Sequence, residues 1–179
     1  MPEGIELPEV HHDHEDSPLV LPVSITISIM AVLVAGVTLM GHRAHTEELM
    51  RQNQATDEWS YYQAVNIRRH NYEMGIDLLA LVDFKDKAQA EKVHETYQKN
   101  AERYQKEQAE IQDKAKEFEA ESAHGQREAD RFDLGEVFLE VALVISSLAL
   151  LSGKRIFWFL GIVAGLAGLG VALTGFLLH

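Results

Sequence analysis

The stretch LVLPVSITISIMAVLVAGVTLMG, residues 19–41, contains no charged residue. A helix of about 20 such residues crosses the ~30 Å hydrocarbon core of a bilayer. Two further apolar runs follow at residues 134–152 and 156–178, and the last of these also lacks charge. The sequence therefore predicts an all-α transmembrane protein with three spans, and membrane lipid is its first expected partner.

Polar segments precede and separate these spans. Residues 1–18 form an acidic, His-rich tail that we expect to be disordered, with six acidic and no basic residues. Residues 42–133 form an extramembrane insert with 14 Lys or Arg and 20 Asp or Glu. Because no basic stripe is present, we expect no nucleic-acid partner. The insert is also too polar to be an ordinary globular domain.

The insert is expected to be a long helical hairpin. All four prolines lie in the first 22 residues, so nothing forces a helix to break from Val23 onward. The first helix should run from the first span to about Val82, followed by a turn near residues 83–86. Either Asp83 or Asp86 can cap the second helix, which returns to the membrane.

A heptad ladder in the second arm predicts a coiled coil. Large residues recur at Tyr97, Tyr104, Ile111 and Phe118, and mostly small residues follow each of them four positions later. In the first arm, Trp59 and Tyr62 belong to a stripe that fits either a helical core or a ligand-stacking surface. A two-helix hairpin buries little surface by itself. We therefore expect a homo-oligomer or docking to a partner protein complex.

The third span carries small residues at helical spacing. In lipid, small residues let helix backbones approach closely, and they can serve packing within one chain or oligomerisation. The residues concerned are Gly161, Gly165, Gly168, Ala172 and Gly175.

A carboxylate is expected at the membrane edge. If the second span began after Glu140, too few apolar residues would remain to cross, so Glu140 should lie within the hydrocarbon edge. We expect a polar cluster there, either an ion or proton site or a structural contact. Its candidate members are Glu136, Glu140, Thr38, His42, Arg43 and His179.

The tail offers a weak metal-binding hypothesis. His11, His12, Asp13 and His14 are suitable ligands for zinc, nickel or copper, although adventitious capture explains them as well. No cofactor is expected otherwise. The sequence has no cysteine, no glycine-rich phosphate loop and no metalloprotease or hydrolase motif, so we do not expect an enzyme.

The segment Trp59-Ser60-Tyr61-Tyr62-Gln63-Ala64, the His-rich tail and the three-span layout resemble a bacterial family of uncharacterised membrane proteins, domain of unknown function 4337. The resemblance covers nearly the whole chain. It implies a protein of the bacterial inner membrane and supplies no activity. The basic residues near the span ends favour a cytoplasmic insert.

Three functions fit these features. The first is a non-enzymatic, oligomeric membrane scaffold whose hairpin mediates self-assembly or partner docking. The second is a channel or transporter component that uses Glu136 and Glu140 as a cation or proton site. The third is a metal-responsive membrane sensor that acts through the tail. Because both carboxylates lie at one end of a span, the scaffold interpretation is favoured.

Overall fold

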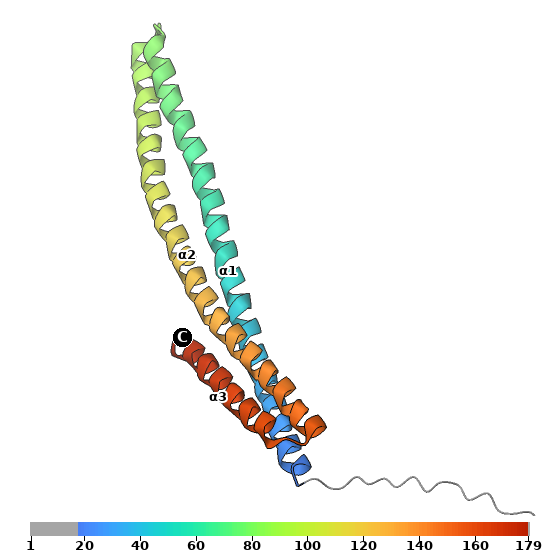
Figure 1. The fold of residues 1–179 in the computed structure, drawn as a ribbon. Coiled ribbons are helices and arrows are strands. Elements are labelled where there is room, and N and C mark those ends of the chain that lie inside the picture. Colours follow the sequence, from blue (N-terminus) through green and yellow to red (C-terminus); the bar gives the residue numbers. More distant parts are fainter. Residues whose placement is uncertain (1–17, 179) are drawn as a thin grey trace, which may run out of the picture. The chain divides into compact units, whose positions relative to one another are not determined.

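The computed structural model describes residues 18–178 as three helices (Figure 1). These are α1 (Val20–Leu81), α2 (Lys87–Ser152) and α3 (Arg155–Leu178). The described residues contain no strand. Each helix includes a stretch that is long and apolar enough to cross a membrane. The predicted all-α fold, with three such helices and a long helical hairpin, is confirmed.

Local chemistry explains where the helices begin and end. Pro22 lies in the first turn of α1, where a missing N–H is tolerated. Asp86 caps α2, because the Gln89 backbone N–H donates to Asp86 Oδ1 at 3.0 Å. Gly153 separates α2 from α3 with a φ of 66°, and its N–H donates to the Ala149 carbonyl at 3.0 Å.

The described chain divides into two compact units that share α1 and α2. The first, which we call the apolar unit, contains the described residues up to Leu39 together with Arg131–Leu177. The second, which we call the arm unit, is residues 40–130.

In the arm unit, α1 and α2 lie side by side as an antiparallel pair (Figure 1). We call the line of contact between them the seam. On α2 its buried positions follow the heptad ladder and include Tyr104, Gln108, Ile111, Ala115 and Ala129. On α1 they include Ala44, Ala55 and Val65. Val65, Tyr104 and Ile111 form its core. Burial of this apolar stripe stabilises the pair in water.

In the apolar unit, α2 contacts both other helices. Leu139 and Ser146 of α2 are fully buried, and Ser146 Oγ lies 3.9 Å from the Met30 sulfur of α1. One turn nearer the start of α1, Trp158 Nε1 of α3 donates to Thr26 Oγ1 at 3.1 Å. Leu19, Val23 and Ala149 form a small core beside this bond.

The glycine stripe of α3 faces α2 of the same chain. A Cβ on Gly168 would lie 2.8 Å from the Gly135 carbonyl oxygen, and one on Gly161 would lie 3.0 Å from the Ala142 carbonyl oxygen. Such backbone proximity is the form of packing that small residues allow in lipid. All members of the stripe are buried, namely Gly161, Gly165, Gly168, Ala172 and Gly175. The stripe is therefore used for packing within one chain.

This packing predicts opposite effects at two glycines of the same helix. Gly168→Ala should destabilise the apolar unit by about 1–3 kcal/mol, because backbone atoms that cannot rotate away occupy the space of the new methyl group. Gly170 has nothing within 4 Å of its Cβ position, so Gly170→Ala should be neutral or stabilising. Thermal unfolding in detergent, followed by circular dichroism, measures both. Equal unfolding temperatures for the two variants would contradict the helix contact.

Candidate functional site

A polar contact joins α1 and α2 inside the apolar unit. Thr38 Oγ1 lies 2.6 Å from Glu136 Oε1 and 2.9 Å from the Val34 carbonyl oxygen. Both side chains are half-buried. Glu136 comes seven residues after the buried seam position Ala129, so the heptad ladder directs it towards α1. The structure therefore brings together two of the residues that the sequence placed in a polar cluster.

Glu140 lies apart from this contact. It is exposed on the outer face of α2, among Val137, Val141 and Val144, and it makes no hydrogen bond or ion pair with any described residue. This differs from the expectation that Glu140 is the central carboxylate of the cluster. The reason is helical geometry. The seam repeats every seven residues, through Ala129 and Glu136, and Glu140 falls four residues past that position and off the seam.

The remaining predicted members have different surroundings. His42 and Arg43 are exposed and belong to the arm unit. His179 lies outside the described residues, as do the candidate metal ligands His11, His12, Asp13 and His14. Within residues 18–178, no three His, Asp or Glu side chains gather so that they could hold a metal ion.

The aromatic residues of the arm pack mainly on one another. Tyr72 of α1 stacks on Tyr104, with ring centroids 5.8 Å apart, and meets Tyr97 edge-on at 5.3 Å. Trp59 contacts Tyr62 edge-on and donates its Nε1–H to Glu119 at 2.7 Å. Phe118 is half-buried on the seam. These contacts use the ring faces for helix pairing and thus favour the core interpretation of the stripe.

A second apolar stripe lies on the opposite face of α1, in the part of the arm next to the turn. Its members alternate at spacings of three and four residues, and all are exposed. Four are large, with exposed fractions of 62% for Ile67, 47% for Met74, 57% for Leu78 and 82% for Leu81. We call this surface the outer stripe, and it consists of Ala64, Ile67, Asn71, Met74, Leu78 and Leu81.

The outer stripe is not apparent from the sequence alone. The seam residues of α1 have the same alternating spacing of three and four residues as the outer stripe. Read along the chain, the two apolar repeats overlap and resemble one broad hydrophobic pattern. The burial of Val65 against α2 separates the two faces, because it assigns one of them to the seam and leaves the other exposed.

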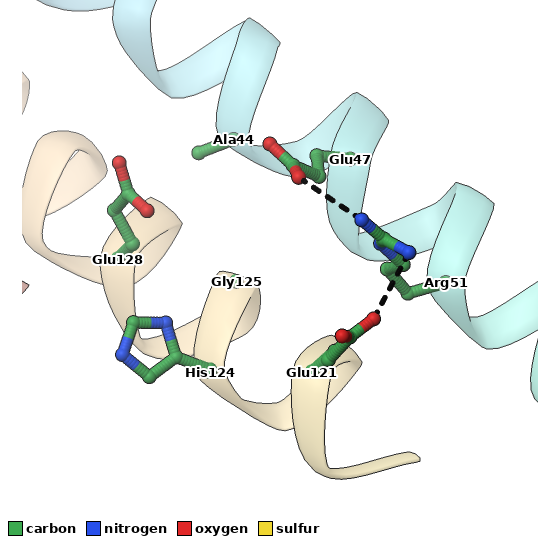
Figure 2. Close-up of a pocket in the computed structure, with 7 residues that line it drawn as sticks. All are labelled: Ala44, Glu47, Arg51, Glu121, His124, Gly125 and Glu128. Carbon is green, nitrogen blue, oxygen red and sulfur yellow. Dashed lines mark ion pairs between the residues drawn. The ribbon is translucent and has the colours of Figure 1, made fainter. Parts of the chain in front are cut away.

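A hollow in the arm unit lies where small residues face each other across the seam (Figure 2). Ala44 and Gly125 form its walls, and Figure 2 shows His124 and Glu128 on the α2 side. Arg51 bridges the helices, with Nη1 3.0 Å from Glu121 Oε2 and Nη2 3.8 Å from Glu47 Oε1. These ion pairs are partly exposed, so each contributes little to stability.

The comparisons with known proteins identify the family and supply no activity. The sequence matches the family described as Domain of unknown function (DUF4337) over residues 21–178, and the chain belongs to this family. No curated protein matches it. No solved structure matches it either.

One hydrogen bond across the arm predicts a pH effect. Tyr61 Oη donates to Glu107 Oε1 at 2.5 Å, and this bond to a carboxylate raises the pKa of Tyr61 above its usual value near 10. Because the folded pKa is the higher one, the contact stabilises the fold below the unfolded pKa. That contribution is lost as pH rises through the folded value.

Ultraviolet titration of tyrosinate should show this effect. The difference between the titration curves of wild type and Tyr61→Phe isolates the titration of Tyr61. In a Glu107→Gln background, this titration of Tyr61 should move to lower pH. A Tyr61 titration that is the same with and without Glu107 would show that the hydrogen bond is absent in solution.

Proposed function

We propose that this protein is a non-enzymatic, integral membrane scaffold that associates with a second copy of itself through the outer stripe of α1. The three helices that are long and apolar enough to cross a membrane support membrane insertion. The family resemblance and the basic residues near the span ends support a bacterial inner membrane with a cytoplasmic arm. The outer stripe is the observation that carries the proposed self-association.

The outer stripe is unusual for a surface in water. Four large apolar side chains gather on one face of α1 in the arm, and contiguous exposed apolar surface of this kind marks interaction sites. By contrast, α2 has no large exposed apolar residue between Lys87 and Arg131. The alternating spacing of three and four residues is the one with which helices pair side by side. The occupant is therefore a helix.

Asn71 favours a second copy as that helix. It lies in the middle of the outer stripe, and its side chain makes no hydrogen bond within the described chain. Against an apolar partner its amide would be desolvated without compensation, at a cost of roughly 1–3 kcal/mol. In a parallel pair of identical helices it meets its own copy, and the two amides bond to each other. A single Asn of this kind fixes the register and the number of helices.

Orientation and charge fit the parallel pair. Two copies inserted the same way in one bilayer have α1 helices of the same polarity. Two sets of residues flank the outer stripe. On one side lie Gln63, His70 and Asp77, and on the other lie Arg68, Gly75 and Val82. In a parallel pair, these two sets place no like charges opposite each other. The flanking charges are therefore compatible with the parallel pair that Asn71 favours.

Single-cysteine crosslinking tests this proposal, and it gives an unambiguous result because the chain has no cysteine of its own. Ile67→Cys and Leu81→Cys should each form a disulfide-linked dimer in proteoliposomes, since equivalent positions face each other in a parallel pair. Ala109→Cys, on the exposed face of α2, is the matched control and should remain monomeric. Disulfides need Cα atoms within about 7 Å, so only true neighbours react.

The same experiment distinguishes the alternatives. In an antiparallel pair centred on Met74, position 67 of one copy would face position 81 of the other. A disulfide would then form between Ile67→Cys and Leu81→Cys when the two variants are mixed, and neither variant alone would form a dimer. Two results together would overturn self-association through the outer stripe. No cysteine variant would form a dimer, and Met74→Glu would leave the mass of the detergent-solubilised particle unchanged.

A further inference from the structure

The core of the arm unit ends part of the way along the hairpin. On α1 its last buried residue is Val65, and on α2 the matching residue is Tyr104, which belongs to the same apolar cluster. Residues 66–103, all of which the structure describes, contain no buried residue. We call residues 66–103 the distal hairpin, and we call residues 40–65 and 104–130 the proximal arm. The distal hairpin therefore has no buried core of its own.

Polar bonds between the two helices have the same boundary. In the proximal arm, Arg51, Tyr61 and Lys114 each bond to a carboxylate on the opposite helix. Within the distal hairpin, no hydrogen bond or ion pair joins α1 to α2. The helices meet there through half-buried contacts, such as that of the Tyr97 ring with Gly75. Because segments with few buried contacts open at a lower free energy than the rest of a fold, the distal hairpin should open first.

The outer stripe lies on this weakly supported segment. Its large residues, from Ile67 to Leu81, all belong to the distal hairpin. The opposite face of the same part of α1 carries Tyr72 and Gly75, which contact Tyr97 of α2. Most of the stability of a helix in a protein comes from packing of its apolar face. A partner on the outer stripe stabilises α1 as a helix, and that helix then presents its other face to α2.

We propose that the distal hairpin opens and closes as a separate unit, and that pairing of two copies through the outer stripe closes it. A partner that binds only the closed form stabilises that form by mass action. The proximal arm stays paired in both states, because its buried core and its bonds between α1 and α2 do not involve the second copy. The inference rests on the proposed self-association and states how self-association regulates the arm.

Hydrogen–deuterium exchange of the full chain in detergent micelles, measured by mass spectrometry, tests this inference. Met74→Glu places a charge in the outer stripe and should separate the copies, which the mass of the particle reports. Residues 87–103 should then lose protection, while residues 104–129 keep theirs. Exchange is compared on α2 because this helix does not contact the partner in the proposed pair. Gln98→Glu, an exposed substitution on α2 of the distal hairpin, is the matched control and should leave mass and exchange as in wild type.

Dilution of wild type into excess detergent separates the copies without a substitution, and it should reproduce the loss of protection. If Met74→Glu also exposes the proximal arm to exchange, the dilution series decides alone. A wild type that is monomeric at high concentration overturns the proposed self-association, and this inference fails with it. Equal exchange of residues 87–103 in the paired and the separated chain, whether fast or slow, overturns only the inference.

Discussion

The packing of α2 against α1 is the interaction on which the rest of the structure depends. Its heptad period appears in both units, at Tyr104 and Ile111 in the arm and, in the apolar unit, at Glu136 beside Thr38 and Ser146 beside Met30. The source of stability differs between the two. In water, the seam is stabilised by removal of apolar surface from solvent. In lipid, removal of apolar surface from water no longer favours contact between apolar helices. Close packing of small residues and hydrogen bonds between helices stabilise the contact instead.

The proposed membrane insertion of the apolar unit accounts for the composition of the two units. The arm has aromatic residues on its seam, and Tyr72, Tyr97 and Tyr104 bury large ring surfaces there. The apolar unit has glycine where α3 meets α2, because dispersion contacts require near approach of the backbones. Glu136 lies at a seam position in the second environment, and a polar side chain at such a position needs a partner, which Thr38 provides.

The arm presents surface on two faces of one helix. Val65 of α1 is buried against α2, while Ile67, two residues later, points away from it and is exposed. A two-helix pair can cover only one face of each helix. The outer stripe is therefore a property of the hairpin as much as of its sequence.

The sequence by itself determined the helices. The three uncharged or nearly uncharged runs, the lack of proline after Pro22 and the heptad ladder of α2 are local patterns, and hydrogen bonding within each helix satisfies the backbone without outside partners. The tertiary structure decided which face of each helix meets which neighbour. It placed Glu136 rather than Glu140 beside Thr38, turned the glycines of α3 towards α2 and left the outer stripe of α1 uncovered. Spacing along one helix defines a face, and only the pairing of helices selects the neighbour that each face contacts.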